Sequence, residues 1–414
     1  MKKRIVFFVN SLTGGGAEKI LQTLLNRWEG SGWNISVYCL KKEDVPSGYP
    51  RNIAFRFLLG SLRQGDGFWT RLKIKAGNKL KLLVYRHCPP SVFYRMFIRG
   101  TYDVEAAFIE GYATRIASGS PNADSRKLAW VHIDLAANHW TLPAYRNAEE
   151  EKRAYRRFDT VVSVSPDVQE SVVALAGPLR DARVLYNPID VQAIKEKSAE
   201  FVPQRPEGKT LFCASGRLVP QKGFDRLVEA CHRLAQAGFS FHLWILGEGP
   251  EGRKLEVLVR ERGLQDRITF LGHQENPYPY MRAADWMVCS SRSEGHSTVI
   301  SESLILGIPV VSTLCSGVRE QLGDGEFGLI AGNDTQDLLR ALEDILTERA
   351  DRRDYGERAL RGGSRVDLDG RMNALEGLFE TNHSIACLLS PLSFLFSMPV
   401  IFWKNVWIPS FGKP

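Results

Sequence analysis

The stretch "SRSEGHSTVISESLILGIPVVS", residues 291–312, decides the fold class of this chain. The apolar run that leads into it, "DWMVCSS", predicts a buried strand. The residues after Gly295 have helical spacing as far as Gly307, and a second apolar run, "IPVVS", follows. A strand, a loop, a helix and another strand therefore follow one another, which is typical of a parallel α/β sheet.

Two glutamates, Glu294 and Glu302, stand at this strand-to-helix corner. If the helix starts at Glu294, they lie about 12 Å apart along its axis and only about 80° apart around it. Both side chains can then face one cleft, where each carboxylate can accept hydroxyl hydrogen bonds. The pair is expected to hold a transferred sugar at one end and a ribose at the other, with phosphates at the helix N-terminus between them.

The same alternation of strand-like and helix-like segments runs along the chain in two series. The first begins at "RIVFFVN" and the second at "TLFCASG", and a polar stretch with several prolines separates them. With 414 residues, 44% of them hydrophobic, the chain is long enough for two domains. The sequence predicts an α/β fold of two Rossmann-like domains that face each other across a cleft. The expected parts are an N-terminal domain (1–187), a linker (188–208), a C-terminal domain (209–380) and a hydrophobic tail (381–414).

Basic residues are concentrated in the first half of the chain. Residues 1–190 carry 28 basic and 18 acidic side chains, whereas residues 191–414 carry 26 and 29. This asymmetry suggests that the first half meets an anionic partner, such as a nucleic acid, a phospholipid surface or a phosphorylated substrate. An unpatterned soluble surface is the plainer alternative.

The N-terminus and the cysteines favour a cytosolic protein. The apolar run at residues 5–9 is shorter than the roughly 7 to 15 residues that a signal peptide needs. The seven cysteines are scattered singly, which favours buried reduced thiols over disulfides or a zinc site.

Two further loops follow predicted strands. The glycines of "GGGAEK", residues 14–19, would let a phosphate or sugar approach the backbone at a helix start, although a tight turn alone could require them. The third glycine of a dinucleotide fingerprint is missing, which weakens an NAD interpretation. In "SGRLVPQKGFDRL", residues 215–227, Arg217 and Lys222 can converge on one diphosphate without a metal, or they are simply solvated.

These motifs resemble the retaining GT-B glycosyltransferases of family 4, which use nucleotide sugars. The resemblance covers about residues 3–379. Its most specific parts are "EGHSTVISE", similar to the family's Glu-x7-Glu element, and "GRLVPQKG", similar to its Gly-Arg-Leu…Lys-Gly loop. Weaker support comes from "GGGAE", "YNPID" and "GHQENPYPYMRAADWMVCSS", the last of which looks like the branch that builds bacterial surface glycans.

The resemblance implies a role for each matching residue. Arg217 and Lys222 would bind the donor diphosphate and stabilise the leaving nucleotide, and Glu302 would bind the ribose hydroxyls. Glu294 would stabilise positive charge at the anomeric carbon. His132 would lie beside the transferred sugar, although a lone histidine at a strand end is more often a core residue. The other donor contacts implied are Gly15, Gly16, Gly272, His273, Gly295, His296, Ser297 and Thr298.

The implied reaction is front-face transfer with retained anomeric configuration, in which the departing phosphate oxygen takes the acceptor's proton. His296 and Ser297 stand where an apolar residue and a proline are common in the family, which leaves the donor sugar open. The "DLD" at residues 367–369 has the form of another fold's metal motif, but it lies in a polar segment and is expected to cap a helix. No metal and no cofactor are expected, since the nucleotide sugar is itself a substrate.

Residues 63–99 hold nine Lys or Arg residues against one acid, Asp66, with aromatic residues between them. Such a stretch suits an anionic bilayer surface or a pyrophosphate-linked lipid acceptor. A solvated helix face is the alternative, and nucleic acid is not expected, because no recognised nucleic-acid module surrounds the stretch. The residues expected to meet the acceptor or membrane are Trp69, Arg71, Lys73, Lys75, Lys79 and Lys81.

The tail differs from the rest of the chain. Residues 384–403 form an uncharged run of 20 residues, about the minimum for crossing a bilayer, but Pro391 and Pro399 interrupt any helix. An interfacial or re-entrant anchor, a segment packed on the N-terminal domain and an extension that does not fold all remain open.

The sequence therefore predicts a hexosyl- or N-acetylhexosaminyltransferase. It would move a sugar from a nucleotide sugar, with UDP as the favoured nucleotide, to a lipid-linked glycan acceptor. The product would belong to surface polysaccharide or lipopolysaccharide biosynthesis. We expect the protein in the cytoplasm, peripherally associated with the inner face of the cell membrane. The alternatives are a nucleotide-sugar epimerase or hydrolase of the same fold, and a non-catalytic subunit that binds nucleotide sugar or lipid.

Overall fold

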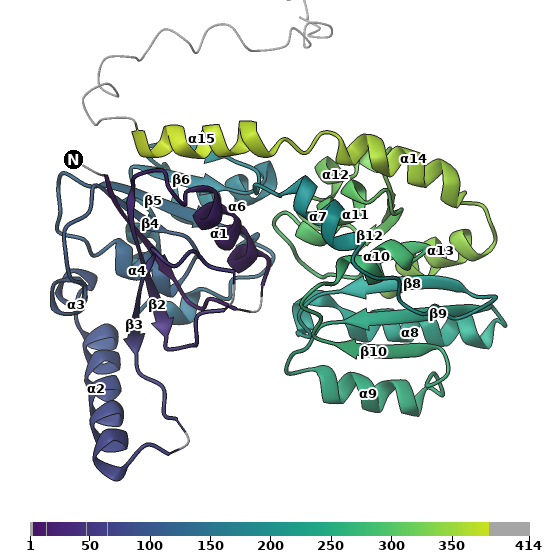
Figure 1. The fold of residues 1–414 in the computed structure, drawn as a ribbon, viewed down its shortest axis with the longest axis horizontal. Helices are drawn as coiled ribbons and strands as arrows, with labels where there is room; N and C mark the ends of the chain where they lie inside the picture. Colours follow the sequence, from purple (N-terminus) through teal and green to yellow (C-terminus); the bar gives the residue numbers. More distant parts are fainter. Residues whose placement is uncertain (1–2, 14, 47, 64, 381–414) are drawn as a thin grey trace, which may run out of the picture.

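A computed structural model describes residues 3–380 except residues 14, 47 and 64. Within these residues the chain forms two parallel sheets (Figure 1). The first sheet has the order β3-β2-β1-β4-β5-β6-β7 and the second β10-β9-β8-β11-β12-β13. The prediction of a two-domain Rossmann-like α/β fold is confirmed.

The first sheet consists of β1 (Arg4–Val9), β2 (Asn34–Lys41), β3 (Ala54–Leu59), β4 (Val104–Ala107), β5 (Arg126–Val131), β6 (Thr160–Ser163) and β7 (Ala182–Val184). Its helices are α1 (Gly16–Arg27), α2 (Phe68–His87), α3 (Pro90–Phe97), α4 (Tyr112–Ala117), α5 (Ala148–Tyr155) and α6 (Pro166–Ala176), with a short 3₁₀ turn η1 (Leu142–Ala144).

The second sheet consists of β8 (Thr210–Ser215), β9 (Phe241–Leu246), β10 (Ile268–Gly272), β11 (Trp286–Cys289), β12 (Val310–Thr313) and β13 (Leu329–Ala331). Its helices are α7 (Val191–Ser198), α8 (Phe224–Gln236), α9 (Gly252–Glu261), α10 (Tyr278–Ala283), α11 (Thr298–Ile305), α12 (Val318–Gln321), α13 (Thr335–Leu346) and α14 (Arg352–Gly363), with 3₁₀ turns η2 (Pro220–Lys222) and η3 (Gly323–Gly325).

The apolar runs form strands because both faces of each sheet are covered. In β1, Phe7 packs into the core on one face of the sheet and Phe8 into the core on the other. Every residue of β9 is buried. Strands of a parallel sheet that is covered on both sides read as continuous apolar segments, as these do in the sequence.

The strand order places two switch points opposite each other. In the first sheet the order reverses between β1 and β4, and in the second between β8 and β11. Ligands of open parallel sheets bind beyond the carboxyl ends of the strands at such points. The glycine loop follows β1, the Arg217 loop follows β8 and the Glu294 loop follows β11, so all three motifs lie at switch points.

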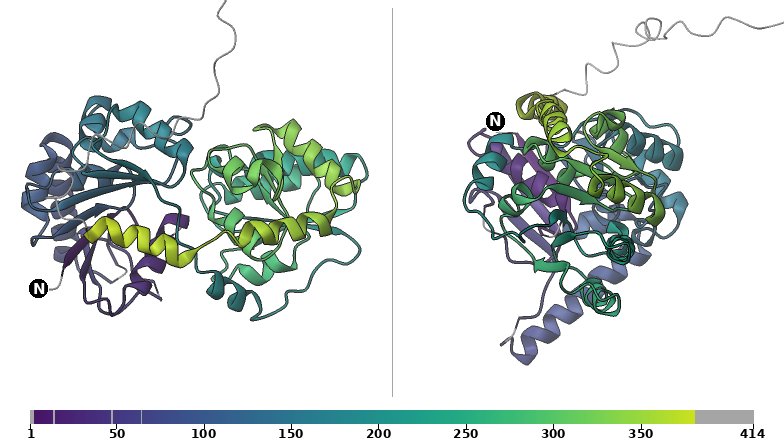
Figure 2. Two further views of the ribbon diagram at one scale, coloured as in Figure 1. Left: turned by 90° about the horizontal axis from the view of Figure 1, so that it is seen from above. Right: turned by 90° about the vertical axis from the view of Figure 1, so that its right-hand side faces the viewer.

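The chain returns to the first domain after α14, where the sequence led us to expect the second domain to continue to residue 380. Helix α15 (Leu368–Glu380) lies along the N-terminal domain, as Figures 1 and 2 show in yellow. The ring of Phe379 is 5.3 Å from that of Trp28 and 6.2 Å from that of Phe7. Asp367 caps this helix, since its Oδ1 accepts a hydrogen bond from Gly370 N at 2.9 Å, as expected for the "DLD" stretch.

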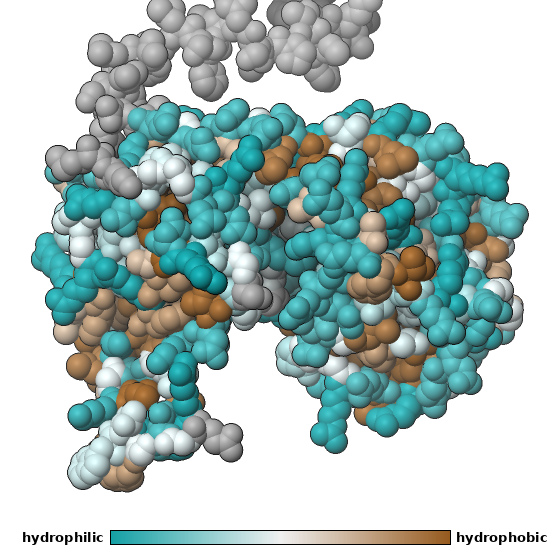
Figure 3. Space-filling view, in the orientation of Figure 1, coloured by the Kyte–Doolittle hydropathy of each residue, from teal (hydrophilic) through white to brown (hydrophobic). Residues whose placement is uncertain are grey.

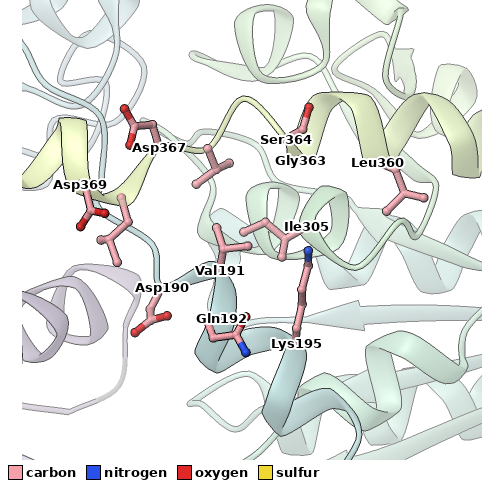
Figure 4. A pocket seen from close by; sticks show the side chains of 12 residues that line it. Asp190, Val191, Gln192, Lys195, Ile305, Leu360, Gly363, Ser364, Asp367 and Asp369 are labelled. Carbon is pink, nitrogen blue, oxygen red and sulfur yellow. The ribbon is translucent and has the colours of Figure 1, made fainter.

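The expected linker also contains structure. Residues 191–198 form α7, which contacts α10 and α11 of the second domain. The chain thus crosses between the domains twice, before α7 and before α15. A pocket of about 360 Å³ lies at these crossings and is lined by residues from both, including Asp190, Lys195, Val366 and Asp367 (Figure 4).

Helix α2 projects from the first domain (Figures 1 and 2). Asn78 fastens it to the body, because its side chain accepts a hydrogen bond from Gly60 N and donates one to Gly60 O. Among the described residues, no helix is long and apolar enough to cross a membrane. The tail, residues 381–414, lies outside the described residues.

Candidate active site

The loops at the two switch points meet between the domains, beside the notch that the space-filling view shows (Figure 3). A side chain added at Gly15 would place its Cβ 3.7 Å from Arg217 Nη2, and one added at Gly16 would place it 3.2 Å from the Thr298 side chain. A Cβ at Gly16 would therefore crowd the opposite domain, whereas one at Gly15 would only contact it. Gly14 of the same motif lies outside the described residues.

Lys222 and Glu294 form the central ion pair of the site. Lys222 Nζ donates a hydrogen bond to Glu294 Oε1 at 2.6 Å, and Ser291 Oγ donates to the same oxygen at 2.5 Å. Burial alone would lower the pKa of the lysine ammonium, but the carboxylate outweighs burial and raises that pKa. The ammonium group is therefore charged and positioned at the carboxyl ends of β8 and β11.

The local geometry of the two glutamates differs from the helical estimate. Helix α11 begins at Thr298, with Ser297 as its N-cap, so Glu294 lies in the preceding loop and not at the helix start. The residue after Glu294 must be glycine, because a Cβ at Gly295 would stand 2.2 Å from His132 O in the first domain. The estimate of about 12 Å along one axis therefore does not apply.

Glu302 lies in the second turn of α11 and its side chain is 6% exposed. Its Oε1 lies 3.4 Å from the hydroxyl of Tyr278 and 3.7 Å from Lys19 Nζ. Lys19 belongs to the first domain, so this ion pair joins the two domains at the site. One hydroxyl group and one cation are thus gathered beside the carboxylate.

His132 follows β5 and lies where the domains touch. Its Nε2 is 2.8 Å from Phe108 O, to which it donates, and its backbone N–H donates to Glu110 Oε2 at 3.1 Å. Burial lowers the pKa of the imidazole to about 4. The ring is therefore neutral at physiological pH, and its Nδ1 keeps a lone pair for a hydroxyl donor.

The contact between the domains is built around Gly295. This glycine forms an antiparallel bridge with Ile133, and its carbonyl accepts a hydrogen bond from Ser165 Oγ at 2.8 Å. Beside it, Ser316 Oγ donates to Asp134 Oδ2 at 2.6 Å. The first domain therefore holds the loop that carries Glu294.

His296 and Ser297 are turned towards protein groups. The backbone N–H of Ser297 donates to Gln321 Oε1 at 2.9 Å, and its carbonyl accepts from Gln321 Nε2 at 2.8 Å. The contact of Ser297 with the donor sugar that the resemblance implies stays a prediction. The His296 ring packs 5.6 Å from Tyr186, and burial lowers its pKa to about 3. Within the described residues its buried Nδ1 has no hydrogen-bond partner.

Gly272 and His273 lie at the end of β10, one strand beyond β9. Gly272 O accepts a hydrogen bond from Gly247 N at 2.8 Å, and a Cβ at Gly247 would stand 2.0 Å from Gly216 O. Through these backbone contacts they adjoin the loop of Arg217. His273 N donates to Glu248 Oε1 at 3.4 Å.

The residues expected to meet an acceptor or membrane lie on α2, away from the donor loops. Trp69, Arg71, Lys73, Lys75 and Lys79 are exposed. Lys81 differs, because its Nζ donates to Leu58 O at 2.6 Å and lies 6.0 Å above the Phe97 ring. It supports the root of the helix instead of facing outward.

Sequence reasoning missed three residues of the site, Glu18, Lys19 and Tyr278. Glu18 and Lys19 end the "GGGAEK" motif, so their position after a glycine loop was the available signal. Tyr278 lies in the quoted run "GHQENPYPYMRAADWMVCSS", but that run did not indicate its contact with Glu302, which joins separate segments. In the described part of the chain, no group of three or more His, Cys, Asp or Glu side chains could hold a metal ion.

Comparisons with known proteins agree with this geometry. A family described as Glycosyltransferase Family 4 matches residues 14–193, and one described as Glycosyl transferases group 1 matches residues 195–361. The chain is 33% identical over 361 residues to the N-acetylgalactosamine-N,N'-diacetylbacillosaminyl-diphospho-undecaprenol 4-alpha-N-acetylgalactosaminyltransferase of Campylobacter jejuni. That alignment covers 86% of this chain and 94% of the relative.

Two further similarities are more limited, one in its coverage and the other in its sequence identity. The chain is 34% identical over 205 residues to the lipopolysaccharide core biosynthesis glycosyltransferase LpsE of Rhizobium meliloti, and this alignment covers 49% of the chain and 58% of the relative. The structure of Anabaena HepE with UDP and glucose superposes with a TM-score of 0.67 at 18% identity, over 91% of this chain and 98% of that one. At that identity the superposition shows a shared fold.

Proposed function

Because the chain belongs to glycosyltransferase family 4, we propose that it transfers a sugar, with retention of anomeric configuration, from a UDP-sugar to a lipid-linked glycan acceptor. The glycan would be lipopolysaccharide or another surface polysaccharide. One observation carries the proposal: the ion pair of Lys222 and Glu294 adjoins the loop of Arg217, whose guanidinium lies opposite Gly15 of the first domain.

The donor assignment rests on the chemistry of these loops. A diphosphate at Arg217 and Lys222 would meet two cations and the backbone of the glycine loop, which suits phosphate oxygens. Glu302 would accept the ribose hydroxyls and Glu294 would face the sugar. UDP is the nucleotide in the structures of HepE, which supports the choice of base.

The transfer step would need no separate general base. The acceptor hydroxyl would attack the anomeric carbon on the face that the nucleotide leaves, and the departing phosphate oxygen would take its proton. Arg217 and Lys222 would stabilise the charge that develops on that oxygen, and Glu294 the positive charge on the sugar ring. Neutral His132 would accept a hydrogen bond from a sugar hydroxyl and so position it.

Helix α2 supports an acceptor at a bilayer. At about 100° per residue, Trp69, Leu72, Ala76, Leu80 and Leu83 share one sector roughly 80° wide. This apolar face of α2 points away from the body of the domain, since Trp69 is 72% exposed, Leu80 53% and Leu83 52%. Arg71, Lys75, Lys79 and Arg86 lie along one side of it.

An exposed apolar stripe with a basic flank fits the surface of an anionic membrane. We therefore propose that the protein associates peripherally with such a surface on its cytoplasmic side. The C. jejuni relative supports a lipid-linked acceptor, because its name specifies a diphospho-undecaprenol substrate.

The test is transfer from a panel of nucleotide sugars with and without a membrane lipid extract. We expect UDP release from one UDP-sugar to rise when the extract is present, and the product to carry the donor's anomeric configuration by NMR. Equal release without extract would favour a hydrolase or epimerase. An inverted product, or no release from any donor, would overturn the proposal.

A further inference from the structure

Glu18 lies in the first turn of α1 and its carboxylate turns back over the glycine loop. A Cβ at Gly15 would stand 2.4 Å from Glu18 Oε2 and 3.7 Å from Arg217 Nη2. A carboxylate of the first domain and a guanidinium of the second thus approach one point of the site from opposite sides. A diphosphate bound at Arg217 would come close to this carboxylate.

The groups around Glu18 make its negative charge costly. Burial is the largest effect and raises the pKa of the carboxyl to about 7, Arg217 opposes it, and Glu110 and Glu43 add to it. Lys19, the next residue, directs its ammonium to Glu302 at 3.7 Å. The Tyr49 hydroxyl contacts the backbone carbonyl of Glu18 at 3.4 Å. The carboxyl therefore changes its protonation state near neutral pH.

The protonation state of the Glu18 carboxyl determines whether it attracts or repels a diphosphate. Two negative groups in close contact in a largely buried site repel each other strongly, because the protein interior screens their charges less than water does. A protonated carboxyl carries no charge and offers one O–H donor to a phosphate oxygen. The neutral form therefore complements the anion, and the ionised form opposes it.

We propose that Glu18 binds the diphosphate of the donor as a neutral carboxylic acid, beside Arg217. This inference rests on the proposed function, because it takes a nucleoside diphosphate as the ligand. It gives the first domain a polar side chain at the donor diphosphate, in addition to the backbone of the glycine loop. It also couples donor binding to the uptake of one proton.

The coupling has a definite sign. Above pH 7 the free site loses the proton that the occupied site keeps, so the affinity for UDP falls as the pH rises, by up to tenfold per unit. UDP itself contributes nothing in this range, because its terminal phosphate has a pKa of about 6.

The experiment is titration calorimetry of UDP binding to the full chain between pH 7 and pH 9. Two buffers with different ionisation enthalpies report proton uptake directly. We expect the wild type to lose about tenfold or more in affinity across this range and to take up protons. Glu18→Gln keeps an N–H donor without a charge, so its affinity should stay constant and exceed that of the wild type at pH 9.

Glu43→Gln is the matched control, because it changes a nearby carboxylate that is bonded to Leu12 N at 3.0 Å and Ser11 Oγ at 3.1 Å. The UDP affinity of this variant should still fall as the pH rises, but the fall should begin at a lower pH, because Glu43 raises the pKa of Glu18. An unchanged pH dependence in Glu18→Gln, or loss of UDP binding at every pH in that variant when folded, would overturn the inference. Failure of the wild type to bind either UDP or GDP would overturn the proposed function as well.

Discussion

Lys222 Nζ lies 2.6 Å from Glu294 Oε1, although the two residues are 72 positions apart in the chain. The pair joins the loops that follow β8 and β11, the two strands at the switch point of the second sheet. The side chains are 24% and 12% exposed, so both charges are largely withdrawn from water. In the absence of a diphosphate each is the other's main partner, and a donor would have to share the ammonium group between its phosphate and Glu294.

Replacing either cation of the donor site should impair catalysis. We expect Lys222→Ala or Arg217→Ala to lower kcat/KM by roughly 10² or more, since each removes a charged hydrogen bond to the leaving phosphate worth about 3 kcal/mol. Steady-state kinetics with the UDP-sugar found active would measure this. Lys254→Ala is the control, because this lysine of α9 is 75% exposed and pairs with Glu251. Near-normal turnover in both variants would reject the assignment.

Glu302→Gln should act on donor binding more than on the chemical step. Contacts to a ribose change little between the ground state and the transition state, so the donor KM should rise while kcat stays close to normal. The variant also removes the ion pair with Lys19. Lys19→Met therefore separates the two effects, and a fall in kcat in Glu302→Gln that Lys19→Met does not share would contradict a ribose-binding role.

Chelation should leave the reaction nearly unchanged. If Arg217 and Lys222 hold the donor diphosphate, EDTA should alter the initial rate by no more than about twofold. Magnesium added back provides the control. A loss of activity that magnesium restores would show that a metal ion takes part in donor binding.

Membrane association should depend on both the basic side and the apolar stripe of helix α2. Replacing Arg71, Lys75 and Lys79 by Gln should weaken binding to anionic vesicles mainly at low salt, at about 1 kcal/mol per residue. Replacing Trp69 and Leu83 by Ser should weaken it at all salt concentrations, because burial of apolar groups is not screened. Co-sedimentation with the vesicles measures both. Replacing Arg253, Lys254 and Arg260 of α9 by Gln is the charge-matched control, and an equal effect there would contradict the role of α2.

Acid should destabilise the protein through His296. Its pKa falls from 6.5 to about 3 on folding, so between these values the unfolded chain binds a proton that the folded chain does not. The free energy of unfolding is therefore complete above pH 6.5 and falls below it, by up to about 1.4 kcal/mol per pH unit for this group. Urea unfolding at pH 7.5 and pH 5 should show a smaller loss in His296→Phe than in the wild type. The same loss in both would contradict the burial of a neutral ring. His232→Gln, at a half-buried position of α8, is the control.

The fold class, and the position of the candidate loops at strand ends, could be predicted from the sequence alone. Apolar runs such as "RIVFFV" and "FHLWIL" are continuous because both faces of a parallel strand are buried, and that condition is visible in local sequence. Parallel strands also end at one edge of their sheet. For this reason Gly15, Arg217 and Glu294, each just beyond a predicted strand, could be assigned to one side of each domain before any coordinates were known.

Which of these groups meet could not be predicted from the sequence. Lys222 reaches Glu294, Lys19 reaches Glu302 and Glu18 faces Arg217 because loops from distant segments converge, and no periodicity in the sequence records such a contact. The placement of α15 on the first domain depends in the same way on the fit of Phe379 against Trp28. Local sequence reports burial and period, which are properties of one segment, whereas a site shared by two domains depends on distances between segments that the folded chain alone sets.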